Sequence, residues 1–127
     1  VHQVVHGFFK DHKQVHLLQP LDYPNLLNMM HRAYFIMTDS GGIQEESPTY
    51  QKPVLILRDV TERPEVVEAG CGILVGTDKA KIIKAFSQLM DDPTYYQQHA
   101  EVENPFGDGH ASERILEQIL QDLKVAE

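Results

Sequence analysis

The chain has 127 residues, of which 42% are hydrophobic and 24% are charged, and its formal net charge is −8. This size and apolar fraction suit one folded domain and exclude a disordered tail, while the acidic balance argues against a general nucleic-acid binder. Cys71 is the single cysteine, so an internal disulfide is excluded. No apolar run is long enough to span a membrane. We therefore expect a cytoplasmic protein without nucleic-acid or membrane partners.

The first part of the chain predicts two helices with a strand between them. Residues 4–11 are expected to form a short helix, and the apolar run at residues 15–18 predicts a buried strand. Asp22 is a suitable N-cap for the next helix, which has Pro24 in its first turn and several apolar side chains along its length.

The middle of the chain alternates short apolar strands with helices. Residues 33–38 are rich in aromatic and branched side chains and predict a strand, after which a glycine pair opens a helix that runs to about Tyr50. Residues 53–57 and 72–75 predict two further strands, with a helical turn at Pro64 between them.

The last third of the chain predicts helices. Asp78 can cap a helix whose apolar face carries Ile82, Ile83, Phe86, Leu89 and Met90. Pro93 starts another helix, a loop follows over residues 104–109, and the last helix covers about residues 111–124. Its apolar stripe consists of Ile115, Leu116, Ile119, Leu120 and Leu123. This stripe predicts a packing face, part of which would be exposed in the chain taken by itself.

This order of elements predicts an α/β fold with a Rossmann-like parallel sheet in three layers. The predicted strands are short and almost continuously apolar, as is typical when helices cover both faces of a sheet. The sequence contains no internal repeat and no linker, so we expect one domain over residues 1–127.

The strand-to-helix turn within residues 38–46, TDSGGIQEE, carries the clearest chemistry. In a parallel sheet, ligands bind at the carboxyl ends of the strands, and two glycines let the backbone approach a ligand closely. The N–H groups at the start of the helix, together with the Ser40 hydroxyl, suit a phosphate. Glu46, one helical turn further on, can accept hydrogen bonds from vicinal sugar hydroxyls. The same residues also fit a helix cap that binds nothing, and they match neither a Walker loop nor a dinucleotide fingerprint.

Five sequence blocks together resemble one protein family. In chain order they are residues 38–46 (TDSGGIQEE), 52–55 (KPVL), 58–65 (RDVTERPE), 76–78 (GTD) and 104–109 (NPFGDG). Their order and spacing, from about residue 18 to the end of the chain, are similar to those of the non-hydrolysing UDP-N-acetylglucosamine 2-epimerases. Each block alone is weakly specific, whereas five in register are highly specific.

The resemblance implies that residues 1–127 are the UDP-binding, carboxyl-terminal domain of a two-domain protein with a glycosyltransferase-B-like fold. The implied reaction interconverts UDP-GlcNAc and UDP-ManNAc by elimination and re-addition of UDP, without a cofactor, for cell-envelope polysaccharide biosynthesis. UDP and UDP-GlcNAc are the implied ligands, and the full-length enzyme is expected to be a homodimer.

The resemblance also implies which residues bind the substrate. Five residues match the binding positions of the family: Ser40, Gly41, Gly42, Glu46 and Arg63. The first three would hold the diphosphate, the glutamate would bind the ribose hydroxyls, and the arginine would stabilise the charge of the leaving UDP. Without the resemblance, an ion pair of Arg63 with Glu62 or Glu65 would be the preferred interpretation.

The acid–base residues of the family have no equivalent in this sequence. In the family they are carboxylates of the first domain and a histidine in a His-Arg-Arg-Glu-Asn-like segment. We expect that segment and an amino-terminal catalytic domain to precede residue 1, so that this chain alone binds UDP weakly and turns over no substrate. The alternatives are a hydrolysing epimerase, a UDP-sugar glycosyltransferase of the same fold, and a non-catalytic UDP-sugar-binding module.

The chain departs from the pattern of the family at residues 47–51 (SPTYQ, where Ala-Pro-Ser-Leu-Gly is common), at Phe106, where tyrosine is usual, and at Leu21 and Leu26. Gln51 stands where glycine is common after the helix, which makes a left-handed helix end more costly. Leu21 and Leu26 stand where a glutamine and an aromatic residue are common near the uracil, so contacts there would rest more on backbone groups.

Several other residues suggest chemistry at first sight. The seven histidines include two pairs at helical spacing, His2/His6 and His12/His16, but no cysteine or carboxylate partner is clearly placed, and we predict no metal site. Cys71 lacks a partner that would lower the pKa of its thiol. Asp108 lies between two glycines and is expected to be a turn residue.

Overall fold

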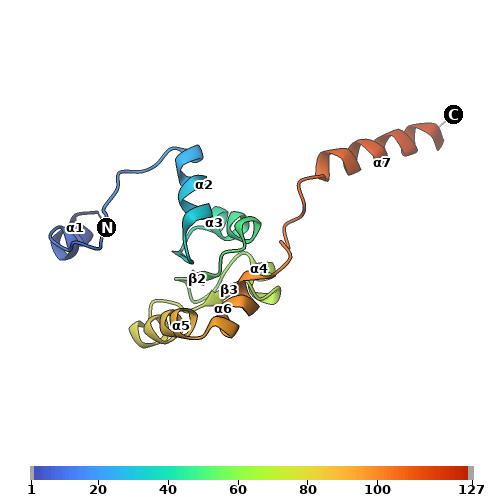
Figure 1. Cartoon of the computed structure of the whole chain (residues 1–127). Coiled ribbons are helices and arrows are strands. Elements are labelled where there is room, and N and C mark those ends of the chain that lie inside the picture. The colour runs from blue at the N-terminus through green and yellow to red at the C-terminus, as the bar shows by residue number, and fades with distance from the viewer. Residues whose placement is uncertain (1, 126–127) are drawn as a thin grey trace.

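The computed structural model describes residues 2–125, and the side chains of residues 4–123. Its sheet has three parallel strands, β1 (Ile36–Thr38), β2 (Val54–Ile56) and β3 (Gly72–Leu74), in the order β1-β2-β3. The predicted fold class, α/β with a parallel sheet, is therefore confirmed (Figure 1).

Three of the helices begin directly after an aspartate that caps them. The helices are α1 (His2–Phe9), α2 (Tyr23–Arg32), α3 (Gly41–Glu46), α4 (Pro64–Glu68), α5 (Lys79–Asp91), α6 (Pro93–Ala100) and α7 (Ala111–Val125), and the 3-10 helix η1 (Ser47–Tyr50) follows α3 directly. The carboxylates of Asp22, Asp78 and Asp92 accept hydrogen bonds from backbone N–H groups in the first turns of α2, α5 and α6. Each carboxylate thus satisfies N–H groups that have no partner within the helix.

Strand β2 forms the centre of the core. Its three side chains are fully buried and alternate between the two faces of the sheet. Val54 and Ile56 cluster with Val66 of α4 on one face, whereas Leu55 clusters with Leu89 of α5 on the other. Helices therefore cover both faces, and the three predicted layers are present.

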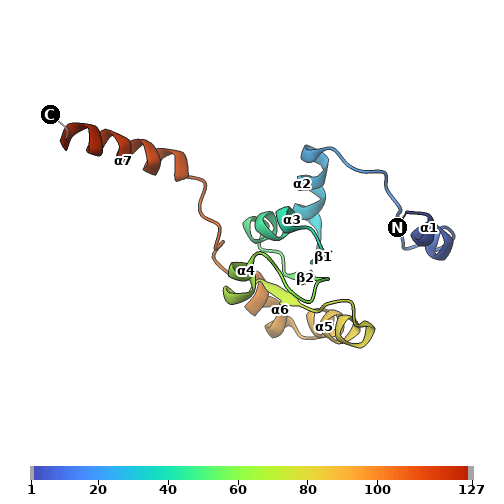
Figure 2. The same ribbon diagram turned by 180° about the vertical axis from the view of Figure 1, so that it is seen from behind.

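Both ends of the described chain lie away from these layers. In two opposite views, α1 and α7 stand apart from the sheet and from each other (Figures 1 and 2). The apolar stripe of α7 is exposed along its length, with relative exposures between 49% and 62%. Among the described residues, no helix has both the length and the apolar character needed to cross a membrane.

The predicted strand at residues 15–18 is wrong. The segment is irregular, Leu18 is 52% exposed, and the N–H of Val15 donates to the carbonyl oxygen of His12 in a turn. An extended segment becomes a strand only when it pairs with neighbouring backbone, and the described strands pair with one another and not with this segment.

One other prediction was only partly right. The helix expected from the glycine pair to about Tyr50 divides into α3 and η1, because Pro48 has no N–H with which to continue the α-helical ladder. On the apolar face of α5, Leu89 is fully buried, whereas Ile83 and Met90 are about half exposed.

Gln51 ends η1 in a left-handed conformation, with φ 54° and ψ 45°. Its N–H donates to the carbonyl oxygen of Pro48 and thereby closes the helical turn. A residue with a Cβ is disfavoured in this conformation, as expected from the replacement of the common glycine by Gln51.

We expect Gln51→Gly to raise the free energy of unfolding of the chain by about 1 kcal/mol, because glycine adopts the left-handed region without steric strain. Urea unfolding followed by circular dichroism measures the change. Gln97→Gly, in the regular helix α6, is the matched control and should lower stability by about 0.5–1 kcal/mol. Equal losses of unfolding free energy in the two variants would contradict the backbone strain assigned to Gln51.

Candidate functional site

The candidate site lies where β1 and β2 end. Thr38 and Ile56 are paired at the carboxyl ends of the two strands, and the N–H of Leu57 donates to the Thr38 carbonyl oxygen at 2.9 Å. The chain that leaves β1 at Asp39 and the chain that leaves β2 at Arg58 therefore start from the same edge of the sheet. This is the edge at which parallel α/β sheets bind their ligands.

The turn after β1 presents hydrogen-bond donors to open space. Ser40 is the N-cap residue of α3, and its backbone N–H donates a hydrogen bond to the Thr38 hydroxyl oxygen at 3.0 Å. Its own hydroxyl makes no capping bond to the helix, in contrast to a simple serine cap. Gly42 is exposed, and a Cβ added to it would meet no atom within 4 Å. The first N–H groups of α3 are thus accessible to a ligand.

Arg63 lies beside this turn. A Cβ added to Gly41 would lie 3.9 Å from Nη2 of Arg63. The guanidinium donates through Nε to Oε1 of Glu45 and through Nη1 to the Glu62 carbonyl oxygen, and the bond to Glu45 raises the pKa of Arg63. The ion-pair partners considered from the sequence, the side chains of Glu62 and Glu65, were wrong, because the partner is Glu45 of α3.

A side-chain network fixes the Arg63 loop to α3. The amide oxygen of Gln44, a residue only 1% exposed, accepts the Thr61 hydroxyl at 2.6 Å. The Thr61 hydroxyl oxygen in turn accepts the N–H of Arg63 at 3.0 Å. A buried amide oxygen without a partner would cost about 1–3 kcal/mol, so the network favours one placement of the loop. Neither Gln44 nor Thr61 was assigned a role from the sequence, although both lie within the blocks that resemble the family.

Glu46 ends α3 and is held from a distant part of the chain. Its Oε1 accepts the hydroxyl of Tyr23, the first residue of α2, at 2.9 Å. This bond raises the pKa of Tyr23, since the phenolate would lie against a carboxylate. Sequence reasoning missed Tyr23, because 23 residues separate the two partners and no local pattern links them.

The five residues proposed from the sequence fall into two adjoining groups. Ser40, Gly41, Gly42 and Arg63 lie together at the start of α3. Glu46 lies four residues beyond Gly42, or about 6 Å along the helix axis. The first group can bind an anion, and the carboxylate can accept hydrogen bonds from hydroxyl groups.

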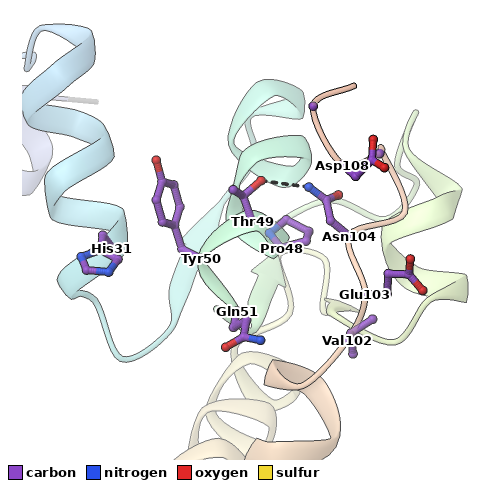
Figure 3. Close-up of a pocket in the computed structure, with 11 residues that line it drawn as sticks. His31, Pro48, Thr49, Tyr50, Gln51, Val102, Glu103, Asn104 and Asp108 are labelled. Atoms are coloured by element: carbon purple, nitrogen blue, oxygen red, sulfur yellow. Dashed lines mark hydrogen bonds between the residues drawn. The ribbon is translucent and has the colours of Figure 1, made fainter. Parts of the chain in front are cut away.

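A hollow of about 750 Å³ lies elsewhere, between η1 and the loop at residues 102–109 (Figure 3). The amide of Asn104 donates to the Thr49 hydroxyl oxygen at 2.9 Å across it. Asp108 in the same loop accepts the N–H of His110 and pairs with Arg114, which lowers the pKa of the Asp108 carboxyl to about 2. It is thus the predicted turn residue, and none of the five proposed residues lines this hollow.

The structure shows no metal-binding cluster among the described residues: no group of three or more histidine, cysteine, aspartate or glutamate side chains could hold an ion. The side chain of His2 lies outside the described part of the chain. Cys71 is buried, its thiol donates to the Val66 carbonyl oxygen, and burial raises its pKa. The thiol is therefore protonated at neutral pH and a poor nucleophile.

Known sequences resemble this chain over nearly its whole length. Residues 1–120 match the family model described as UDP-N-acetylglucosamine 2-epimerase. The chain is 48% identical over 120 residues to the UDP-N-acetylglucosamine 2-epimerase of Bacillus subtilis (strain 168), covering 94% of this chain and 32% of that protein. It is 51% identical over 125 residues to a putative UDP-N-acetylglucosamine 2-epimerase of Clostridium acetobutylicum, covering 98% of this chain and 32% of that protein.

Solved structures give the same result. The S. aureus MnaA–UDP co-structure superposes with a TM-score of 0.86 at 48% identity, over 96% of this chain and 33% of that chain. The UDP-GlcNAc 2-epimerase of Neisseria meningitidis bound to UDP-GlcNAc gives a TM-score of 0.87 at 44% identity, over 94% and 33%. The chain thus spans about one third of the length of its relatives and has the fold of that part of these glycosyltransferase-B-like structures. It belongs to the UDP-N-acetylglucosamine 2-epimerase family.

Proposed function

We propose that residues 1–127 form the UDP-binding, carboxyl-terminal domain of a non-hydrolysing UDP-GlcNAc 2-epimerase. The observation that carries the proposal is the placement of Arg63 against the Ser40–Gly42 turn at the carboxyl edge of the sheet. The likeness to a relative solved with UDP and to one solved with UDP-GlcNAc supports the same ligand here.

The diphosphate would bind at the start of α3. The N–H groups of Gly41 and Gly42 and the Ser40 hydroxyl would donate to phosphate oxygens, and the Arg63 guanidinium would supply a positive charge beside them. This charge matters most when the bond between the sugar and UDP breaks, because negative charge then develops on the leaving diphosphate. The local donors also explain how a chain with a net charge of −8 could bind an anion.

The ribose would bind one helical turn further along α3. An ionised glutamate has about four acceptor sites, and the Tyr23 hydroxyl occupies one of those on Glu46. The remaining sites suffice for the two vicinal hydroxyls of a ribose. In this proposal the diphosphate contacts lie at the start of α3 and the ribose contact lies at its end.

The proton transfers would belong to residues outside this chain. Epimerisation by elimination needs a base at the sugar as well as stabilisation of the leaving group. The site described here provides donors and a cation for the leaving group, while Glu45 is paired with Arg63 and Glu46 is assigned to the ribose. We therefore propose that this domain holds UDP while an amino-terminal domain carries out the proton chemistry.

Gly42→Ala separates a ligand site from a simple helix cap. The added methyl group meets open space in this structure, so the free energy of unfolding should not fall. The same methyl group would lie where the diphosphate must approach the backbone, and we expect the affinity of the chain for UDP to fall at least tenfold. Isothermal titration calorimetry measures the affinity. Gly7→Ala, which also meets open space but lies in α1, is the matched control. Unchanged UDP binding by Gly42→Ala would contradict the proposed site.

A chimeric enzyme tests the proposed reaction. In the chimera, residues 1–120 of this chain take the place of the matching third of the B. subtilis relative. We expect the chimera to convert UDP-GlcNAc to UDP-ManNAc, which proton NMR detects. Arg63→Ala in the chimera should lower kcat by about 100-fold, because the leaving group loses its cation. Lys84→Ala, which removes an exposed cation on α5, is the control.

Two results would contradict the proposal. One is a folded chimera that turns over no substrate. The other is release of UDP and free ManNAc in place of UDP-ManNAc, which would indicate a hydrolysing enzyme.

A further inference from the structure

The Tyr23–Glu46 hydrogen bond is a long-range contact between α2 and α3. It joins the first residue of α2 to the last residue of α3, with 2.9 Å between the two oxygens. Tyr23 is 58% exposed, so its ring contributes little to the core. A hydrogen bond at such a place stabilises the fold weakly, and its main effect is to restrict the Glu46 side chain.

The backbone around Tyr23 is held firmly. The Asp22 carboxylate accepts the N–H of Asn25 at 3.0 Å, and Pro24 fixes one backbone angle of the first turn. At the other end of α2, the ring of His31 contacts that of Tyr50 edge-on, with 5.8 Å between their centroids. The phenol hydroxyl is therefore presented to α3 from a helix that is capped at its start and contacts η1 near its end.

A glutamate at the end of a short helix is otherwise free to rotate. Fixing such a side chain costs up to about 2 kcal/mol of conformational entropy, and a ligand that must fix it loses that amount of affinity. The Tyr23 hydroxyl restricts Glu46 before a ligand arrives. Oε2 of Glu46 makes no hydrogen bond within the described part of the chain, so it stays available to a ligand.

We propose that Tyr23 is a positioning residue that aims the Glu46 carboxylate at the ribose and so makes the site selective for ribonucleoside diphosphates. The inference rests on the proposed UDP site and extends it to a residue that does not itself touch the reacting atoms. Tyr23 would act through Glu46 alone, by orienting its second oxygen towards the vicinal hydroxyls.

The test compares two nucleotides on the same chain. UDP and 2′,3′-dideoxyuridine 5′-diphosphate differ only in the two ribose hydroxyls, and their dissociation constants can be measured by NMR titration of the ¹⁵N-labelled chain. Tyr23→Phe keeps the ring and removes only the hydroxyl. We expect it to weaken UDP binding about fivefold and to leave the affinity for the dideoxy analogue unchanged.

Matched variants isolate the role of the hydroxyl. Tyr34→Phe removes the hydroxyl of another half-exposed tyrosine, which precedes β1 and stacks on Tyr96 of α6, and should change neither affinity. In a Glu46→Ala background, Tyr23→Phe should have no further effect on UDP binding, because the side chain that the hydroxyl positions is gone.

The outcomes distinguish this inference from the proposed function. If the unaltered chain binds neither nucleotide, the proposed UDP site itself is wrong. If UDP binds and Tyr23→Phe leaves both affinities unchanged, or lowers them equally, Tyr23 does not position Glu46. Retained affinity in Tyr23→Phe with loss in Tyr23→Leu would assign the ring to a direct nucleotide contact and would also overturn the inference.

Discussion

The parallel pairing of β1 with β2 is the constraint on which the candidate site depends. The register places Thr38 opposite Ile56, and the N–H of Leu57 extends the pairing by one further bond to Thr38. Two chain segments separated by a helix and a 3-10 helix consequently leave the sheet side by side. β2 can hold this register because its three side chains are buried on both faces, so a slip by one residue would exchange the two clusters that it joins.

The second constraint is the rigid attachment of α3 to its neighbours. Gln44 fastens the helix to Thr61 and thereby to the backbone of Arg63, while Glu45 pairs with the guanidinium itself. Three consecutive residues of α3 thus have distinct roles. The buried amide of Gln44 holds the loop, the carboxylate of Glu45 orients Arg63, and the carboxylate of Glu46 accepts the Tyr23 hydroxyl. This division explains why the polar run after the glycine pair is dense.

The sequence predicted the features that follow from local rules and missed those that depend on distant partners. Asp22 and Asp78 cap the expected helices, and Gln51 adopts the costly left-handed conformation, because these effects arise within a few residues. The run at residues 15–18 has the composition of a strand but lacks a paired neighbour in the structure. Neither the Tyr23–Glu46 contact nor the choice of Glu45 as the partner of Arg63 could be read from spacing, since each depends on how separate elements pack.

The site residues themselves were named from a family resemblance, and their geometry gives that resemblance a physical basis. The most direct test of the account is a ¹⁵N–¹H NMR titration of the labelled chain with UDP. The account predicts that the amide signals of Gly41, Gly42 and Ile43 shift most, because their N–H groups would donate to the diphosphate. Shifts confined to the hollow between η1 and residues 102–109, or none at saturating UDP, would contradict it.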